Sequence, residues 1–423
     1  MEIVVGCVVF AVGIIISIAL HEAGHMWSAK AFGMKVTRYF IGFGPTLFSF
    51  RRGVTEYGVK AIPAGAFVKI VGMTPQDDDV APEDEKRAMW RYPVWKRTIV
   101  MAAGSIMHFA LGIAILWSIF AFLPLNDYDK VPESTAVVDE VSPCITLAFK
   151  VDPATGQQVT CKEGVDPPSP ARAAGLERGD KIVAINGVAT PTWTAFTDAI
   201  RGAGGTSTTI TYERDGVERT SPAVAIPLTE RIKQSVGVKP AKEVTAADLE
   251  KVGQVGVAPM APKVVAGPGA AFGLAIDRTG MLVGLTVDAM KQFPEKIPKL
   301  WHAITGSERD PETPVSMVGA TRIGGELWER GDVASFLGLL VSLNFFVGLF
   351  NLLPLLPLDG GHIAIAWFER VRSWLYARLR RPEPGRIDYM KLMPVTYVVI
   401  LIFGGFTVLT LAADIINPIT LPK

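Results

Sequence analysis

Five consecutive residues near the start of the chain, His21-Glu22-Ala23-Gly24-His25, have the types and spacing of a zinc-dependent hydrolytic site. Two histidines four residues apart on a helix lie on one face, where both rings can bind the same tetrahedral zinc ion. The glutamate after the first histidine can act as general base toward an attacking water. The motif therefore predicts metal-assisted hydrolysis, if the segment is helical and the chain supplies a third ligand.

The element that carries this motif is predicted to be a membrane-spanning helix. Residues 3–20 contain no charged side chain, and the run ends directly at His21. A run of this length is close to what is needed to cross a hydrocarbon core of ~30 Å. A cleaved signal peptide is the alternative, but the chain opens Met1-Glu2 without a basic region, and no small-residue cleavage pattern follows. We therefore expect a hydrolytic metal site at membrane depth.

The composition indicates a membrane protein that also carries a soluble domain. Hydrophobic residues make up 49% of the 423 residues, and the mean hydropathy of +0.31 is high for a soluble protein. The net charge of +1 gives no reason to expect a nucleic-acid partner. The apolar residues are concentrated in four segments that we interpret as membrane spans, at 3–20, 98–125, 333–358 and 392–413.

Lysine and arginine are unevenly distributed and predict the orientation of these spans. Residues 30–97 contain 12 of them and residues 370–391 contain seven, whereas the C-terminal tail has only Lys423. Loops rich in Lys and Arg face the cytoplasm. Both termini and the segment 126–331 are therefore expected to be extracytoplasmic, with the His-Glu motif toward the cytoplasmic side of the cell membrane.

Residues 39–73 are rich in alternating β-formers and are interrupted by glycines, which argues against a helix. Arg51-Arg52-Gly53 is typical of a hairpin turn. The segment is either a cytoplasmic β-hairpin or a loop that dips into the membrane where protein or water covers its backbone. Residues 76–87 are acidic and are expected to form a solvated loop.

The segment 169–187 has the order helix, glycine turn, strand and Asn-Gly turn, and a further helix at 194–201 and strand at 207–214 follow it. It closely resembles a PDZ domain, whose signature matches Ser169-Pro170-Ala171 and the residues after it. Such domains bind extended peptides by strand addition. Cys144 and Cys161 lie 17 residues apart in what looks like an insertion, and either a disulfide or two free thiols is consistent with the sequence.

Residues 239–332 are harder to interpret. Helical periodicity at 273–293, at 299–304 and before Arg330 favours amphipathic helices lying on the outer membrane surface.

A zinc site needs a third protein ligand, and few candidates lie at membrane depth. They are His108, Asp359, His362 and Asp414. Asp359 closes an otherwise apolar span, where a carboxylate is costly unless it is paired or metal-bound. Two prolines before it, Pro354 and Pro357, break the helix and can turn Asp359 toward the His-Glu motif.

The motif at 21–25, together with the Asn-x-x-Pro-x-x-x-x-Asp-Gly pattern at 351–360, resembles the site-2 proteases, the intramembrane zinc metalloproteases. The likeness covers nearly the whole chain and is greatest to the actinobacterial branch that cleaves membrane-bound anti-sigma factors. It implies one zinc held by His21, His25 and Asp359, with Glu22 as base. It also places Asn351 beside the substrate, although a helix-packing amide is the alternative reading of that residue.

Two further features follow from the resemblance. Gly42-Phe43-Gly44-Pro45 matches the family's re-entrant β segment, so Gly42 and Gly44 are expected to border an unwound substrate. The family's second-span motif GPxxN is altered here, with Ser105 replacing the proline and His108 the asparagine. His108 either supports the site through a hydrogen bond or is a structural histidine. His362 is an alternative ligand or an outer support of the site.

The expected fold is thus a polytopic α-helical membrane protein with four transmembrane helices, a re-entrant β-hairpin on the cytoplasmic side and an extracytoplasmic α+β PDZ domain. The expected segments are a first span at 1–32, a β-rich loop at 33–75, a cytoplasmic loop at 76–97, a second span at 98–125, the PDZ domain at 126–238, a following region at 239–332, a third span at 333–369, a basic loop at 370–391 and a last span with tail at 392–423.

The expected function is a zinc metalloendopeptidase that cuts the membrane segments of single-span proteins in regulated intramembrane proteolysis. The resemblance favours anti-sigma factors or signal-peptide remnants as substrates, after a first cleavage outside the membrane. Lipid surrounds the spans, and the peptide bound by the PDZ domain is not named by the sequence. The alternative is a non-catalytic membrane scaffold that binds extracytoplasmic peptides through the PDZ domain. The intact motif and Asp359 argue against it, because neither is needed for binding alone.

Overall fold

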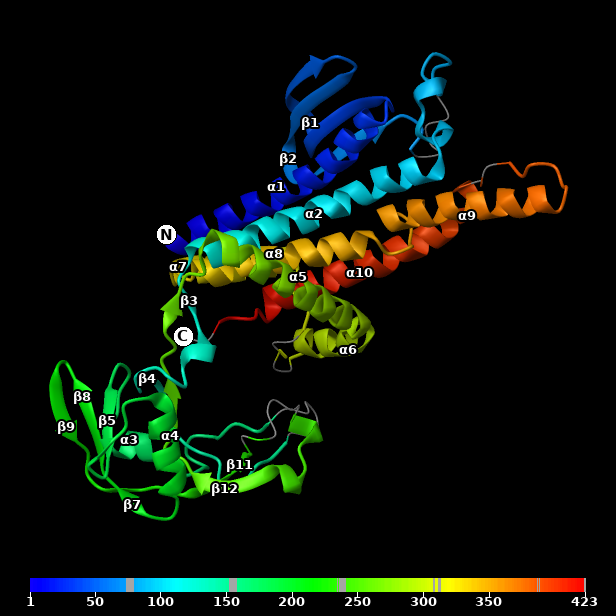
Figure 1. The fold of residues 1–423 in the computed structure, drawn as a ribbon. Coiled ribbons are helices and arrows are strands. Elements are labelled where there is room, and N and C mark those ends of the chain that lie inside the picture. Colours follow the sequence, from blue (N-terminus) through cyan, green and yellow to red (C-terminus); the bar gives the residue numbers. More distant parts are fainter. Residues whose placement is uncertain are drawn as a thin grey trace. The chain divides into compact units, whose positions relative to one another are not determined.

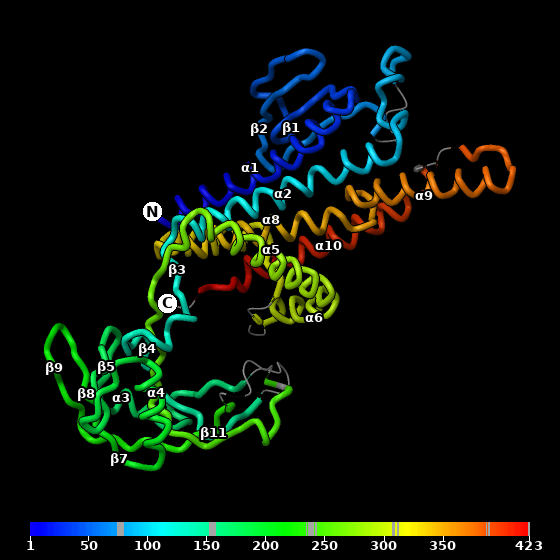
Figure 2. Tube along the Cα trace, viewed as in Figure 1, coloured from blue at the N-terminus to red at the C-terminus, as the bar shows by residue number. Residues whose placement is uncertain are grey.

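The computed structural model describes residues 1–73, 80–151, 158–233, 235, 241–306, 309–310, 313–385, 387 and 389–421. The chain divides into two compact units. The first consists of Met1–Leu123 and Ala266–Lys423, and the second is Pro124–Val265. Figure 2 shows the chain leaving the first unit after α2 and re-entering it at α5, so the second unit is an insertion in the first. Part of the acidic loop expected at 76–87 lies outside the described residues.

The first unit is built from helices that pack along one another (Figure 1). Helix α1 packs on α2 and α7, and α2 also packs on α5, α8 and α9. The helices are α1 (Glu2–Ala31), α2 (Val94–Phe122), α5 (Gly267–Lys291), α6 (Phe293–Ile304), α7 (Met317–Glu329), α8 (Val333–Asn351), α9 (Asp359–Arg378) and α10 (Met393–Ile416). Short 3-10 helices of the first unit lie at Glu85–Arg87, Met89–Arg91 and Tyr389–Leu392, and those of the second unit lie at Tyr128–Lys130, Ala241–Glu243 and Ala246–Asp248.

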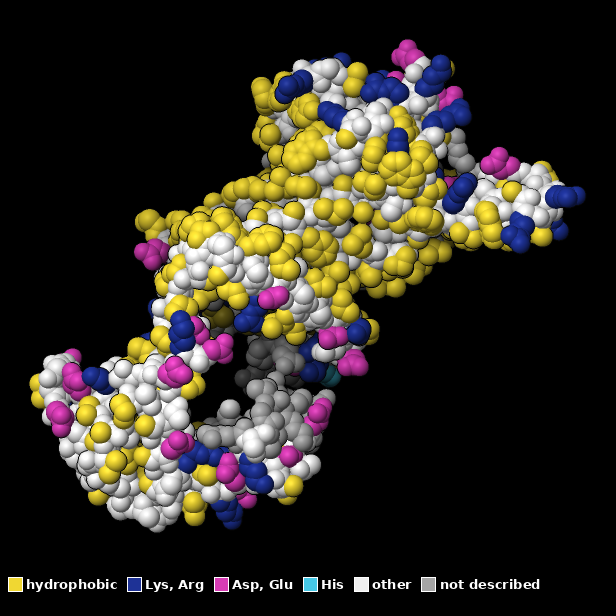
Figure 3. Space-filling view, in the orientation of Figure 1, with side chains coloured by type: hydrophobic (Ala, Val, Ile, Leu, Met, Phe, Trp, Pro, Cys, Tyr) yellow, Lys and Arg dark blue, Asp and Glu magenta, His cyan; other side chains and the backbone are white. Residues whose placement is uncertain are grey.

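Five helices in the described part of the chain are long and apolar enough to cross a membrane, where the sequence predicted four spans. Four of them overlap the expected segments, although α2 ends at Phe122 and α8 at Asn351, before the predicted ends at 125 and 358, and the fifth is α5. From its helical periodicity, the segment 273–293, most of which lies in α5, was expected to be an amphipathic helix on the membrane surface. The predicted number of four is therefore not confirmed. Hydrophobic side chains cover much of the visible surface of this helical unit (Figure 3), as lipid contact requires.

Two glycines allow α1 and α2 to approach closely. A Cβ atom on Gly24 would lie 2.5 Å from the carbonyl oxygen of Ala103, and one on Gly104 would lie 2.5 Å from the His21 and His25 rings. Small residues commonly permit such contacts between membrane helices. The two glycines thereby place α2 directly against the face of α1 that carries both histidines.

The predicted hairpin is present as two long antiparallel strands, β1 (Val36–Arg52) and β2 (Thr55–Ile70). Both strands bend back on themselves. Residues 38–41 of β1 therefore pair with residues 66–69 of β2 on one side and with residues 56–59 of β2 on the other. The bend in β1 requires glycine at Gly42, where φ is +90° and a Cβ atom would lie 2.7 Å from the carbonyl oxygen of Ile62. Residues 66–70 consequently form an outer edge of this sheet.

The second unit contains a four-stranded sheet of order β6-β5-β8-β9, with helices α3 and α4. Its apolar core includes Ile182, Phe196 and Ile210, which are almost fully buried. The elements are β3 (Leu125–Asn126), β4 (Val138–Val141), α3 (Pro170–Ala173), β5 (Lys181–Ile185), β6 (Val188–Ala189), α4 (Trp193–Gly202), β7 (Ser207–Thr208), β8 (Ile210–Arg214), β9 (Val217–Thr220), β10 (Val224–Ala225), β11 (Leu228–Ile232), β12 (Leu249–Gly253), β13 (Val257–Pro259) and β14 (Lys263–Val264).

The order of turns, helices and strands expected at 169–214 is present in this unit. The Ser169 side chain caps α3, and the Asn186-Gly187 turn follows β5. The PDZ assignment itself stays a prediction. Strands β12–β14 also belong to this unit, whereas the sequence analysis expected mainly helices from residue 239 onward. In the structure Cys144 and Cys161 are joined by a disulfide.

Candidate metal centre

Three side chains from α1 and α9 converge on one point in the helical unit. The Nε2 atoms of His21 and His25 lie 3.1 Å apart, and each lies 3.3 Å from Oδ2 of Asp359. Both histidines are buried and the Asp359 side chain is 13% exposed. Together they form a group of metal-ligand type, found in a search of the described residues, whose ligand atoms lie within 4.8 Å of one another.

The geometry of the three atoms fits zinc. Ligands about 2.0–2.1 Å from a tetrahedral zinc stand about 3.3 Å from each other, which matches the observed separations. Asp359 Oδ2 is buried and forms no hydrogen bond among the described residues, although it faces both rings. A buried carboxylate oxygen without a donor is costly. Two imidazoles and one carboxylate are also a zinc ligand set that leaves a fourth position open.

His25 is held by a backbone group of the neighbouring helix. Its Nδ1 atom lies 2.7 Å from the carbonyl oxygen of Val100 on α2. A carbonyl only accepts, so Nδ1 carries the proton and Nε2 presents its lone pair to the cluster. A metal-binding histidine usually donates the N–H of its other ring nitrogen to a carbonyl or carboxylate in this way. The sequence did not point to Val100, because any residue can supply a carbonyl.

A break between α8 and α9 brings Asp359 to the histidines. Helix α8 ends at Asn351, and α9 begins at Asp359 itself. Two glycines let the first turn of α9 pack against the intervening segment. A Cβ atom on Gly360 would lie 2.2 Å from the carbonyl oxygen of Leu352, and one on Gly361 would lie 2.6 Å from the carbonyl carbon of Leu355. The Asp-Gly-Gly sequence thus combines a ligand with the space needed to position it.

Glu22 lies on α1 between the two histidines in sequence and contacts the β-hairpin. Its Oε2 atom accepts a hydrogen bond of 3.1 Å from the backbone N–H of Val68. Tyr39 of β1 donates to the carbonyl oxygen of Ala19, 2.8 Å away, one turn before Glu22. The outer edge of the hairpin therefore faces the carboxylate that the sequence predicts as the base.

His108 lies beside the cluster, with its ring centroid 4.9 Å from that of His21. It contacts Asn344 of α8 and Ser17 of α1, two residues that the sequence analysis did not single out. Both are ordinary residues within apolar spans, and only the packing of three helices brings them together.

The other predicted site residues do not belong to the cluster of His21, His25 and Asp359. Asn351 is partly buried at the C-terminal end of α8. His362 lies one turn after Asp359 and lines a small cavity with Arg97 and Met101. Gly42 and Gly44 lie at the bend of β1, close to Ile62. Roles in substrate binding or ligand support for these four residues stay predictions.

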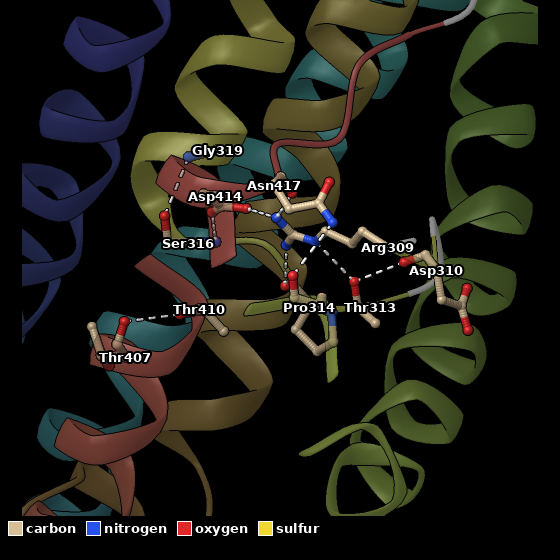
Figure 4. A network of polar contacts seen from close by, with 11 residues as sticks. Arg309, Asp310, Thr313, Pro314, Ser316, Gly319, Thr407, Thr410, Asp414 and Asn417 are labelled. Carbon is tan, nitrogen blue, oxygen red and sulfur yellow. Dashed lines mark hydrogen bonds and ion pairs between the residues drawn. The ribbon is translucent and has the colours of Figure 1, made fainter. Parts of the chain in front are cut away.

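Asp414, which the sequence left open as a candidate ligand, takes part in a different cluster. Its Oδ1 atom lies 2.6 Å from Nη1 of Arg309, and both side chains are almost fully buried. Its Oδ2 atom accepts from the backbone N–H of Ser316. Arg309 also donates to Thr313 and to the carbonyl oxygens of Pro314 and Asn417 (Figure 4). Asp414 is therefore an ion-pair partner here and lies apart from the group of His21, His25 and Asp359.

Comparisons with known proteins agree with this geometry. A model of peptidase family M50 matches residues 9–381. The chain is 40% identical over 430 residues to the zinc metalloprotease Rip1 of Mycolicibacterium smegmatis, covering 99% of this chain and 98% of the relative. It is also 40% identical over 425 residues to the zinc metalloprotease Rip1 of Mycobacterium tuberculosis, with both chains covered completely. The regulator of sigma-E protease RseP of Escherichia coli is 27% identical over 439 residues, covering 86% of this chain and 90% of the relative.

Proposed function

The chain belongs to peptidase family M50 and is a zinc metalloprotease, and we propose that it hydrolyses peptide bonds within the membrane segments of single-span proteins. The observation that carries the proposal is the convergence of His21, His25 and Asp359. Two of these ligands lie on a helix long and apolar enough to cross a membrane. A substrate bond must therefore reach the site at membrane depth.

We assign the metal to His21, His25 and Asp359 and the proton transfers to Glu22. Zinc held by these three residues would supply a Lewis acid for the scissile carbonyl and would make the attacking water easier to deprotonate. Glu22 accepts that proton and later donates it to the leaving amine. The Val68 N–H binds one oxygen of Glu22, which restrains the position of the carboxylate. Asn351 is proposed to hydrogen-bond the substrate backbone or the developing oxyanion.

The substrate is proposed to bind as an added strand on the hairpin. A peptide bond inside a membrane helix is shielded by its own hydrogen bonds, so the helix must unwind locally before hydrolysis. The edge at residues 66–70 pairs with β1 along one side, and such an extended segment is proposed to pair along the other side, where Glu22 now accepts from the Val68 N–H. Because Val68 in this edge contacts Glu22, a strand added there runs past the proposed base.

The substrate class follows from the family resemblance and from one relative's name. The E. coli relative is a regulator of sigma-E protease, which supports anti-sigma factors as substrates here, with signal-peptide remnants as the second class. The second unit is proposed to act as a PDZ domain that excludes intact substrates until their outer portion has been removed. The uneven lysine and arginine distribution supports a cytoplasmic-side active site.

A Glu22→Gln variant tests the proposal. It keeps the three ligands and the hydrogen bond from Val68, so zinc binding and membrane insertion should be unchanged. Cleavage of a single-span substrate should fall by about 10²–10⁴-fold, the usual contribution of a general base. Wild-type cleavage by this variant would refute the assignment of Glu22 as base, and a wild-type protein that contains no zinc and cleaves no substrate would favour the non-catalytic scaffold. Single-span proteins that accumulate on the inactive variant in cells would identify the substrates.

A further inference from the structure

Ser17, His108 and Asn344 form a buried polar network that joins α1, α2 and α8. Ser17 Oγ lies 3.1 Å from His108 Nδ1, and His108 Nδ1 lies 2.9 Å from Asn344 Oδ1. Ser17 also donates to Asn344 Oδ1. The three residues are 5%, 2% and 1% exposed, respectively. Polar groups inside apolar spans are costly unless fully paired, and such paired networks fix the helices that carry them.

The protons in this network can be assigned from chemistry. Asn344 Nδ2 donates to the carbonyl oxygen of Leu340, 2.8 Å away, so its Oδ1 atom faces the network as acceptor. The one proton of Ser17 goes to that oxygen. The Nδ1 atom of His108 must therefore carry a proton and donate it. This arrangement holds the His108 ring in one orientation through partners on two other helices.

The fixed ring lies against a proposed zinc ligand that has little other support. His21 packs between the rings of His25 and His108, with centroid distances of 4.8 and 4.9 Å. Unlike His25, which contacts the Val100 carbonyl, His21 has no hydrogen-bond partner for Nδ1 among the described residues. Packing must therefore set the orientation of its ring. His25 is itself a proposed ligand, so of the two neighbouring rings His108 is the one that does not belong to the metal cluster.

The spacing of residues along α1 and α2 also places His108 beside the His21 ring. Ser17 and His21 are four residues apart on α1, and Gly104 and His108 are four apart on α2, so each pair shares a helix face. The missing side chain of Gly104 makes room for the His21 ring, and His108 borders that space one turn later. The His21 ring thus occupies the space that Gly104 leaves open and packs against the His108 ring, which its own hydrogen bonds hold in place.

We propose that Ser17, His108 and Asn344 are positioning residues that hold the His21 ring in the orientation a zinc ligand requires. The inference rests on the zinc site of the proposed function. It predicts that loosening His108 weakens zinc binding without removing any ligand. Outer partners of metal-binding histidines typically affect metal affinity by about 10–100-fold.

The test is an Asn344→Leu variant, which replaces the amide by an apolar side chain of similar size. In detergent-purified full-length protein, competition against a chelator should show zinc affinity about 10–100-fold weaker than wild type. The absorption bands of the Co²⁺-substituted protein should shift, because they report ligand geometry. Thermal unfolding of the zinc-free protein should occur at a somewhat lower temperature, because Ser17 and His108 lose their acceptor, so zinc affinity and spectrum are compared on the folded protein. Ser342→Ala, an exposed change on the same helix, should leave affinity and spectrum as in wild type.

The outcomes separate this inference from the proposed function. Wild-type protein that binds no zinc contradicts the proposed function itself. Zinc-binding wild-type protein with an unchanged affinity and spectrum for Asn344→Leu overturns only the positioning role. If Asn344→Leu does not fold, Ser17→Ala removes a single hydroxyl and should weaken zinc binding in the same direction to a smaller extent. A Ser17→Ala protein with the wild-type affinity and spectrum also overturns the inference.

Discussion

Two carboxylates of little exposure in the helical unit, Asp359 and Asp414, have opposite surroundings. Asp414 faces Arg309 and the Ser316 N–H, and each of its oxygens has a partner (Figure 4). Asp359 faces two histidine nitrogens, and its Oδ2 atom has no hydrogen bond among the described residues. The nearby Nδ1 atom of His21 also lacks one.

The difference separates a structural network from a binding site. Where all polar atoms are satisfied, as around Asp414, the cluster fixes helices to each other and needs no ligand. Where ligand-type atoms of two histidines and a carboxylate converge on one point, as around Asp359, the cluster has the donor set of a cation site. On this account a change at Asp414 alters stability, and a change at Asp359 alters metal binding and activity.

Removal of zinc should have the largest effect on function. Dialysis against a chelator should lower proteolysis by more than ~100-fold, since several kcal/mol of transition-state stabilisation is lost with the Lewis acid. Helix content measured by circular dichroism should stay the same, because the helices keep their own backbone hydrogen bonds and pack on one another without the metal. Added zinc should restore cleavage. Full activity of the metal-free protein would show that the cluster is structural, like that of Asp414.

An Asp414→Asn variant should have the largest effect on stability. The change leaves the buried Arg309 guanidinium without its charged partner, which typically costs about 3–5 kcal/mol. Thermal unfolding in detergent, followed by tryptophan fluorescence, should occur at a lower temperature, while bound zinc per folded chain stays unchanged.

A paired substitution controls for the loss of charge. Arg309→Met combined with Asp414→Leu removes both charges, and apolar replacement of a buried ion pair is often close to neutral. The double variant should therefore be more stable than Asp414→Asn alone. If the single change costs nothing, the network around Asp414 does not stabilise the helical unit.

The disulfide should have a smaller effect, confined to the second unit. Cys144 and Cys161 are 17 residues apart, and closing a loop of this size is worth about 3 kcal/mol. Replacing both by Ala should make the second unit easier to unfold and to digest with protease, with zinc content unchanged. Cys7→Ala, at the cysteine outside the disulfide, is the matched control. Finding both cysteines as free thiols by mass spectrometry without reductant would contradict the bond.

The sequence pointed to the three residues that the structure brings together as a possible metal site, because they have both the chemistry and the spacing of one. His21 and His25 are four residues apart, and Asp359 is a carboxylate at the end of an apolar span. The supporting groups have no such signal. Val100 contributes only a carbonyl, and Ser17 and Asn344 acquire their roles from helix packing. Arg309 lies in a polar loop far in sequence from Asp414, so nothing in the sequence indicated their pairing.

The fold was predictable where apolar runs are long and free of charge, as in α1 and α8. It was not predictable for α5, because Asp277 and Arg278 interrupt its apolar sequence while its length still allows a crossing. The hairpin was expected from its glycines and β-formers. Its double bend depends on pairing between distant residues of β1 and β2, which local sequence does not specify.

The most direct test is elemental analysis of three purified proteins, namely wild type, Asp359→Asn and Asp414→Asn. The same Asp-to-Asn change is made at both positions. Any difference in zinc content between the two variants therefore reflects the surroundings of each carboxylate and not the substitution itself. The account predicts about one zinc per chain in wild type and in Asp414→Asn, and a loss of zinc in Asp359→Asn. Wild-type protein without zinc, or an equal zinc content in all three proteins, would contradict it.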